Sequence, residues 1–181
     1  MRKLYISAAL VLGALAFSAC EDQDVTPVLQ EPTQFVLNTP AYVNGTYDLA
    51  HSTTLELTCS QPDYGFTAAT SYAVEVSLTG TFDGVESTVL GTTYTTARMN
   101  VDVAEMAAAL TALATAADPT LTEEDFPMET EVYVRLIASL ANSGKGEIAS
   151  NSIILPNVLL HFALPAVNLP ENLYLIGQCN G

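Results

Sequence analysis

The stretch TTLELTCSQPDYGFTAATSYAVEVSLTGTF, residues 53–82, alternates apolar and polar side chains in two separate runs. In the first run, one face carries Leu55, Leu57 and Cys59. In the second run, the apolar face carries Tyr72, Val74, Val76 and Leu78, and the other face carries Ala73, Glu75 and Ser77. A period of two with one apolar face is typical of a half-buried antiparallel strand. The pattern therefore predicts strands over residues 54–60 and 71–78, separated by a turn at 61–65, with Glu75 and Ser77 facing solvent.

Further segments extend this β pattern along the chain. Residues 131–140 alternate in the same way, and the turn-forming sequence NSGKG then leads into a strand over 148–155. Weaker strands are expected over residues 34–38, 87–95 and 158–164. About seven short strands separated by turn signals predict an all-β fold, an antiparallel sandwich of the immunoglobulin or fibronectin III type.

One segment, residues 102–117, breaks the β pattern. Its apolar residues recur at steps of three and four, as on one face of a helix: Val103, Met106, Ala107, Leu110, Leu113, Ala114 and Ala117. Asp102 followed by Glu105 suits a capping pair at its start, and Asp118-Pro119 suits its end. The segment has no lysine or arginine, which a helix lying on a membrane would carry. We expect one inserted amphipathic helix that packs across the sandwich rather than one that binds a partner or a membrane.

The first nineteen residues have the composition of a secretory signal. A basic start at Arg2 and Lys3 is followed by an apolar run over residues 4–17 and by small residues before Cys20. The apolar run is shorter than the roughly 20 residues that a transmembrane helix needs. Residues 1–19 are therefore predicted to be a signal peptide.

The sequence LAFSAC, residues 15–20, resembles a lipobox, in which a peptidase cleaves before a lipidated cysteine. It departs from the common form because Phe17 stands where leucine is usual. On this interpretation Cys20 carries the lipid that holds the chain on a membrane. Ordinary cleavage after Ala14-Leu15-Ala16 is the alternative, and it would leave Cys20 free.

An acidic cluster follows Cys20 directly and contains Glu21, Asp22 and Asp24. Residues 20–32 lack hydrophobic periodicity and include two prolines, so they predict a flexible tether. An acidic cluster behind a lipidated cysteine resembles the surface-export signal of lipoproteins in bacteria that carry starch-utilisation systems. The alternatives are a solvated tail or a weak calcium site, although the spacing does not match a calcium-binding loop.

The charge of the chain excludes one class of partner. After the signal there are three basic residues against twenty acidic ones, a net charge of −17. Phosphate backbones would repel such a chain, so nucleic acid is excluded as a partner. Neither Cys59 nor Cys179 lies in a C-x-x-C or metal-ligand pattern, and both are expected to be structural, unpaired thiols.

The sequence contains no motif that predicts catalysis or a cofactor. His51 and His161 are the only histidines, they lie far apart in sequence, and neither joins a hydrolase or metalloprotease motif. We expect both to be structural, with no metal site. The densest acidic run, residues 123–125, follows Thr122 and is explained as the solvated first turn of a short helix. An enzyme is therefore not expected.

The order of motifs is similar to that of the SusE and SusF outer-membrane lipoproteins. Residues 53–82 resemble the amino-terminal domain of that family, with Cys59 in place of an expected tryptophan. EVYVRLIASL (131–140) and IASNSIIL (148–155) resemble later strands of the family, including Arg135 and the Ser150-Asn151 pair. ENLYLIGQCNG (171–181) resembles the first strand of the carbohydrate-binding modules that follow this domain.

The resemblance implies a non-catalytic, surface-exposed lipoprotein of a starch or glycan utilisation system. It implies an immunoglobulin-like domain over residues 33–164, then a linker and the first strand of a truncated carbohydrate-binding module over residues 165–181. Starch or a related glucan would bind through modules missing from this chain, beside a TonB-dependent transporter complex.

The residues themselves agree that this part of the protein does not hold the glycan. Sugar rings are usually held on exposed aromatic platforms, and the chain has no tryptophan. We therefore expect the domain to act as a spacer that holds glycan-binding modules off the membrane. The alternative is a protein-interaction or adhesin-like module that contacts the outer-membrane transporter complex.

Overall fold

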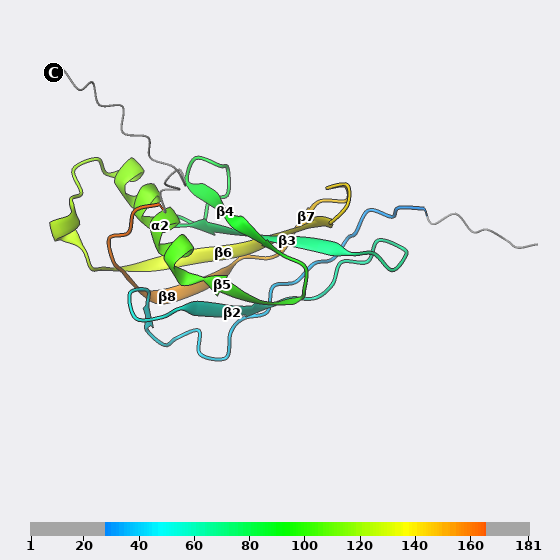
Figure 1. Ribbon diagram of the computed structural model, residues 1–181, viewed down its shortest axis with the longest axis horizontal. Helices are drawn as coiled ribbons and strands as arrows, with labels where there is room; N and C mark the ends of the chain where they lie inside the picture. Colours follow the sequence, from blue (N-terminus) through cyan, green and yellow to red (C-terminus); the bar gives the residue numbers. More distant parts are fainter. Residues whose placement is uncertain (1–27, 166–181) are drawn as a thin grey trace, which may run out of the picture.

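A six-stranded sheet forms one layer of the fold, and a two-stranded sheet and a helix cover one of its faces (Figure 1). The computed structural model describes residues 28–165. In chain order its elements are β1 (Tyr47–Asp48), β2 (Thr54–Thr58), β3 (Thr70–Ser77), β4 (Ser87–Tyr94), β5 (Arg98–Asp102), α2 (Val103–Ala117), the 3-10 helix η2 (Glu123–Asp125), β6 (Met128–Leu140), β7 (Ile148–Ala149) and β8 (Ile153–Leu160). The large sheet has the order β1-β8-β6-β3-β4, with β7 paired to β6, and β2 pairs with β5. The prediction of an all-β fold with one inserted helix is confirmed.

The core lies between these layers and is continuous. Strands β3, β6 and β8 supply most of its large-sheet side, and the smaller sheet supplies Leu55, Leu57, Met99 and Val101. The helix adds Val103, Met106 and Leu110, each at most 1% exposed. The apolar faces predicted for residues 54–60 and 71–78 both point into this core, because period-two alternation directs them there, although Leu78 is only partly buried.

Strand β5 was not predicted from the sequence. It pairs antiparallel with β2 over its whole length, from Thr54 opposite Asp102 to Thr58 opposite Arg98. Its two inward residues, Met99 and Val101, are buried. Two inward positions are too few to define a period, and the strand runs directly into the helix, so its alternation was hidden.

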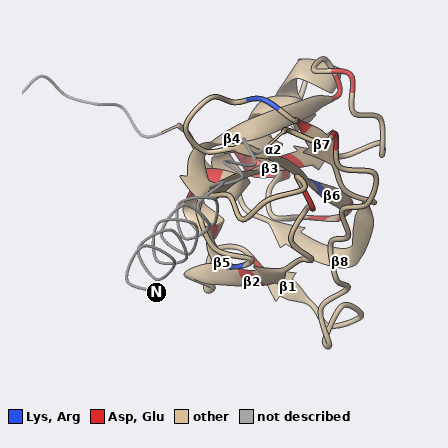
Figure 2. Ribbon diagram, turned by 90° about the vertical axis from the view of Figure 1, so that its right-hand side faces the viewer, with Lys and Arg blue, Asp and Glu red and all other residues tan. Residues whose placement is uncertain are grey.

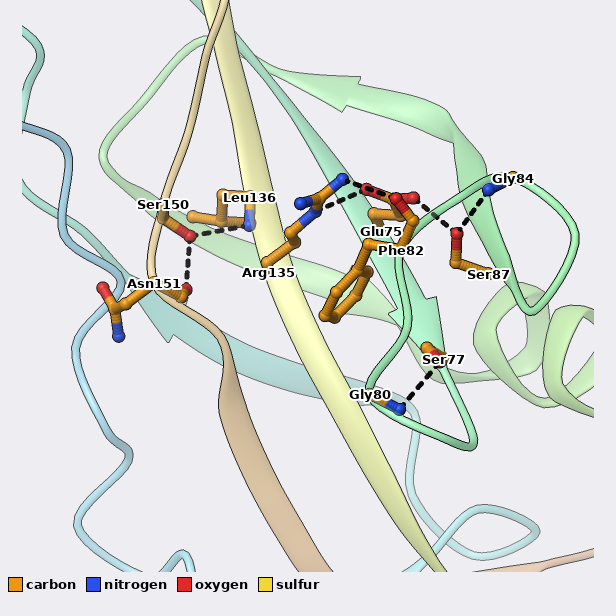
Figure 3. A network of polar contacts seen from close by, with 10 residues as sticks. All are labelled: Glu75, Ser77, Gly80, Phe82, Gly84, Ser87, Arg135, Leu136, Ser150 and Asn151. Carbon is orange, nitrogen blue, oxygen red and sulfur yellow. Dashed lines mark hydrogen bonds and ion pairs between the residues drawn. The ribbon is translucent and has the colours of Figure 1, made fainter.

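Residues 148–164 form strands with bounds different from those predicted. One strand was expected over 148–155 and another over 158–164, but the structure has the two-residue β7 and then β8, which ends at Leu160. Ser150 and Asn151 cause the break. The Leu136 N–H donates to Ser150 Oγ, which in turn donates to the Asn151 carbonyl (Figure 3).

The strand expected over residues 34–38 is reduced to a single bridge between Leu37 and Cys59. The Asn151 side chain satisfies both backbone groups of Leu37. Its Oδ1 accepts from Leu37 N at 2.9 Å, and its Nδ2 donates to Leu37 O at 3.1 Å. A side-chain amide therefore takes the place of a neighbouring strand.

The prediction of a purely antiparallel arrangement was wrong at one edge of the large sheet. Strand β1 pairs parallel with β8, with Asp48 opposite Leu159. A tight hairpin permits only antiparallel pairing, whereas strands joined by a long stretch of chain can pair in either direction. Strands β1 and β8 are separated by most of the domain, so no turn constrains their direction.

Helix α2 begins and ends where the sequence predicts, and Asp102 is its N-cap. Asp102 Oδ1 accepts from Ala104 N at 2.8 Å and from Glu105 N at 3.4 Å. In a capping pair, the Glu105 side chain would accept from the backbone N–H of Asp102, but here it accepts from two backbone N–H groups of β4. Glu105 Oε1 accepts from Gly91 N at 2.6 Å and from Thr92 N at 3.0 Å, which ties the helix to β4.

Replacement of Asp102 by alanine is expected to lower the free energy of unfolding by about 1 kcal/mol, because the first turn loses its side-chain acceptor. Urea denaturation followed by circular dichroism measures this loss. Asp102→Asn is the matched control, since asparagine is an equally good N-cap and should retain most of the stability. Equal losses in the two variants would show that the cap does not stabilise the helix.

The two ends of the described chain lie in opposite halves of the long axis of the molecule (Figure 1). The blue segment near residue 28 lies at the right end, beside the β2–β3 connection, and Gln30 N donates to Tyr64 O there at 3.0 Å. The orange segment after β8 lies at the left half, near α2. Within residues 28–165, no helix is both long and apolar enough to cross a membrane.

Candidate functional site

The residues predicted to anchor and export the chain lie outside the part that the structure describes. These are Cys20, Glu21, Asp22 and Asp24, together with Cys179 and the proposed strand near the carboxyl end. The signal peptide of residues 1–19 also lies outside it. Their roles remain predictions from the sequence.

Cys59 is the only cysteine within residues 28–165, and it is buried and unpaired there. Burial raises the pKa of its thiol to about 11, because the apolar surroundings disfavour the thiolate. The sulfur lies 3.6 Å from the Ala97 carbonyl oxygen, to which it donates. These features agree with a structural thiol.

The acidic run Glu123–Asp125 forms the 3-10 helix η2 and lies on the surface. Asp125 Oδ2 accepts from both the backbone N–H and the hydroxyl of Thr122, at 2.8 and 2.9 Å. These hydrogen bonds lower the pKa of Asp125 and use it as a cap. The run is thus explained by local capping, as expected.

A buried ion pair between Glu75 and Arg135 is the main polar feature that the sequence analysis missed (Figure 3). Arg135 Nε lies 2.7 Å from Glu75 Oε2, and the side chains are 25% and 5% exposed. The second carboxylate oxygen accepts from the Ser87 hydroxyl at 2.7 Å, and Ser87 Oγ accepts from Gly84 N at 3.1 Å. Both oxygens of the carboxylate are therefore satisfied, as a buried charge requires.

The prediction that Glu75 and Ser77 face solvent was wrong, because the β3–β4 connection folds back over that face of the sheet. Arg135 donates to the Phe82 carbonyl at 3.4 Å, and its guanidinium carbon lies 4.4 Å from the centre of the Phe82 ring. Ser77 Oγ accepts from the backbone N–H groups of Thr79 and Gly80, each at 3.1 Å. The connection thus buries side chains that point away from the main core.

Gly80 is required where this connection crosses β6. Its φ is +81°, and a Cβ atom there would lie 3.1 Å from the Tyr133 ring. Any other residue would be strained in backbone and crowded by the ring. Tyr133, which is partly buried, therefore packs under the connection.

A groove of about 480 Å³ lies between the loop at residues 38–42 and strand β2. Buried apolar side chains of Leu55, Met106 and Leu155 contribute to its lining, and Asn38, Thr54 and Thr58 add polar groups. Tyr42, which is 85% exposed, also lines the groove. The groove combines apolar area with hydrogen-bonding groups, which suits contact with another molecule.

His51 and His161 do not lie far apart in the folded chain. The structure brings both beside Asp48, with the His51 Nδ1 atom 2.8 Å from Asp48 Oδ2 and the His161 Nε2 atom 3.2 Å from Asp48 Oδ1. His161, expected within a strand, instead follows the last residue of β8. No sequence motif could have revealed this cluster, because the parallel pairing of β1 and β8 creates it.

The charged residues of the domain are mostly acidic and are spread over several elements, with few basic side chains among them (Figure 2). The surface pair of Arg98 and Glu56 is well exposed, at 73% and 49% of the side chains. Acidic residues therefore outnumber basic ones within residues 28–165.

Comparison with known proteins identifies one family. A sequence model of the SusE outer membrane protein family matches residues 21–137, which is more than half of the chain. The match begins at the acidic cluster behind Cys20 and extends into β6. No solved structure matches the chain.

Proposed function

Since the chain belongs to the SusE outer membrane protein family and is an outer-membrane protein of a starch-utilisation system, we propose that its β domain is a non-catalytic spacer. The domain holds glycan-binding modules away from the membrane. The finer assignment of the domain to the immunoglobulin or fibronectin III type is part of the same proposal.

The observation that carries the proposal is the position of the two ends of the domain. The chain enters beside the β2–β3 connection and leaves from the opposite half of the long axis (Figure 1). A domain whose ends lie together would return the chain to the membrane. A domain whose ends lie apart carries the chain away from it, which supports a spacer.

The length of the domain is set by its strands. Strand β6 has 13 residues, and a rise of about 3.4 Å per residue makes it roughly 40 Å long. The sheet is fixed to the small sheet and the helix by a continuous core, so the distance is held rigidly. A tether of the same number of residues would instead sample many lengths.

In this proposal, a lipid on Cys20 attaches the chain to the membrane. Each buried methylene of an acyl chain contributes roughly 0.8 kcal/mol, so two or three chains hold a protein on a bilayer almost permanently. The acidic cluster Glu21, Asp22 and Asp24 supports export to the outer surface. With this anchor, the end of the domain near Gln30 would face the membrane.

Two labelled variants test the spacer. Asp63→Cys lies in the β2–β3 connection and Glu124→Cys lies in η2, at opposite ends of the domain (Figure 1). The lipidated chain, in a Cys179→Ser background, is labelled with a fluorophore at either site and inserted into vesicles with acceptor headgroups. We expect energy transfer to be strong from position 63 and weak from position 124, because the second label is held at the other end of the domain, farther from the bilayer (Figure 1).

Two results would contradict the spacer. Equal transfer from the two sites would mean that the domain lies flat on the bilayer. Retardation of the 181-residue chain alone during electrophoresis through starch-containing gels would mean that this domain itself binds glycan. A longer chain that continues into carbohydrate-binding modules is the positive control in those gels.

The groove beside Tyr42 favours a second candidate, a protein-interaction or adhesin-like module that contacts a TonB-dependent transporter complex. An exposed aromatic ring next to an apolar floor is typical of contact surfaces. This function differs from the spacer because it depends on the side chains of the groove, whereas a spacer depends only on the shape of the domain.

A further inference from the structure

The two histidines of the chain and one aspartate meet at a single place on the surface. A nitrogen of His51, a nitrogen of His161 and an oxygen of Asp48 all lie within 4.8 Å of one another. The two imidazole rings approach edge to face, with their centres 6.1 Å apart. Three residues that commonly bind transition metals therefore converge, although the chain has only two histidines.

The fold positions each of the three residues through backbone hydrogen bonds. The parallel register sets Asp48 opposite Leu159, and Leu49 N donates to Leu159 O at 3.2 Å. This pairing carries the end of β8, and therefore His161, beside Asp48. A turn closed by Ser52 N donating to Asp48 O at 3.1 Å brings His51 back over the same carboxylate.

Asp48 offers a negatively charged oxygen to a metal, and His161 offers a nitrogen that makes no hydrogen bond within the described residues. Asp48 supplies a carboxylate, whose side chain is 33% exposed and which carries a negative charge at neutral pH. His161 Nε2 is shielded from solvent and has no hydrogen-bond partner among the described residues. It lies at ion-pair distance from Asp48 Oδ1, but not in a direction that makes a hydrogen bond.

We propose that Asp48, His51 and His161 bind a divalent transition-metal cation, with Zn²⁺ as the reference ion. Imidazole nitrogen and carboxylate oxygen are preferred zinc ligands, and three protein ligands leave a fourth position for water. His51 is 79% exposed, so that position opens to solvent. Ca²⁺ and Mg²⁺ are disfavoured because they prefer sites built from oxygen alone.

The distances permit this with small side-chain movements. Zinc bonds of about 2.0–2.1 Å in a tetrahedron set the ligand atoms roughly 3.4 Å apart. His51 Nδ1 lies 2.8 Å from Asp48 Oδ2, and His161 Nε2 lies 3.2 Å from Asp48 Oδ1. With one oxygen counted for Asp48, the three ligand atoms all lie within 4.8 Å of one another, so a small rotation of the carboxylate is needed for a single oxygen to serve as ligand. The exposed His51 ring can rotate to bring the third pair into range without moving the backbone.

A metal here would stiffen the point where the chain leaves the domain. Thr111 of helix α2 already holds this segment, since its hydroxyl donates to His161 O at 3.4 Å and accepts from Ala163 N at 3.3 Å. Bound zinc would add a link from His161 to β1. The site is independent of the spacer function, because the labels at positions 63 and 124 report on length whether or not metal binds.

Titration calorimetry with Zn²⁺ on the full chain in detergent tests the site. We expect one equivalent to bind, and we expect Asp48→Asn and His51→Gln each to weaken that binding by roughly 10- to 100-fold or more. Glu124→Gln is the control, an exposed acidic residue away from the cluster that should bind zinc as the parent does. Because the chain has only two histidines, NMR of the ring protons gives a second readout, and both rings should shift on addition of Zn²⁺ but not of Mg²⁺.

The zinc titrations either support the site or overturn it. Loss of binding in His51→Gln supports the site without risk of unfolding, because this side chain is largely exposed. The proposal is overturned if the parent chain binds no zinc at 100-micromolar levels. It is also overturned if His51→Gln and the parent bind equally, since carboxylates or cysteines elsewhere would then hold the ion.

Discussion

Replacement of Arg135 by methionine is expected to lower the free energy of unfolding by about 3 kcal/mol. The substitution keeps an unbranched apolar stem but leaves the Glu75 carboxylate, 5% exposed, without its cation. Only the Ser87 hydroxyl, at 2.7 Å, would remain beside it. An unpaired buried charge costs far more than the pair contributed, so the loss should exceed that of most single substitutions. Urea unfolding followed by circular dichroism measures it.

The matched control is Arg98→Met, which removes an arginine from an ion pair of similar distance on the surface. Arg98 Nη2 lies 2.8 Å from Glu56 Oε2, but the side chains are 73% and 49% exposed. Exposed pairs contribute little because water screens them, so this loss should stay below about 1 kcal/mol. A larger loss of stability in Arg135→Met than in Arg98→Met would therefore come from the burial of the ion pair and not from breaking an ion pair as such.

The double variant Glu75→Gln with Arg135→Met decides whether the unpaired charge is the cause. A neutral amide can keep its hydrogen bond with Ser87 and needs no cation. We expect the double variant to recover roughly 1–2 kcal/mol relative to Arg135→Met alone. If it is instead less stable than Arg135→Met, the loss comes from packing of the β3–β4 connection on the guanidinium and not from the charge.

Replacement of Leu110 by alanine is expected to destabilise the domain by about 3 kcal/mol. Leu110 is fully buried between helix α2 and the large sheet, so its removal leaves a cavity that the rigid strands cannot close. Alanine is at least as good a helix former as leucine, so helix propensity does not add to the loss. Thermal and urea unfolding measure the effect.

Leu113→Ala is the control on the same helix. Leu113 is only partly buried, so the same chemical change should cost about 1 kcal/mol. A large difference between the two would establish that one face of the helix belongs to the core, as the periodicity of residues 102–117 predicts. Similar small losses would mean that the helix rests loosely on the sheet and is available to a partner.

The sequence determined those features that depend on neighbouring residues. Alternation at Leu55 and Leu57, and at Val74 and Val76, predicted strands and their buried faces, because successive side chains of a strand point to opposite sides. The spacing of Met106 and Leu110 predicted the helix, and Asp102, a good N-cap residue, predicted where the helix begins. The resemblance of residues 53–82 to the SusE and SusF lipoproteins predicted the family, and the family match confirms it.

Tertiary structure decided what depends on segments far apart in the chain. Alternation assigned Glu75 to the solvent face, but it carries no information about a loop that returns to cover that face. Glu105 has the spacing of a capping partner, yet a strand brought close by folding offers it two free N–H groups instead. His51 and His161 meet only because β1 and β8 pair in parallel, a choice made by long-range packing and not by any local turn.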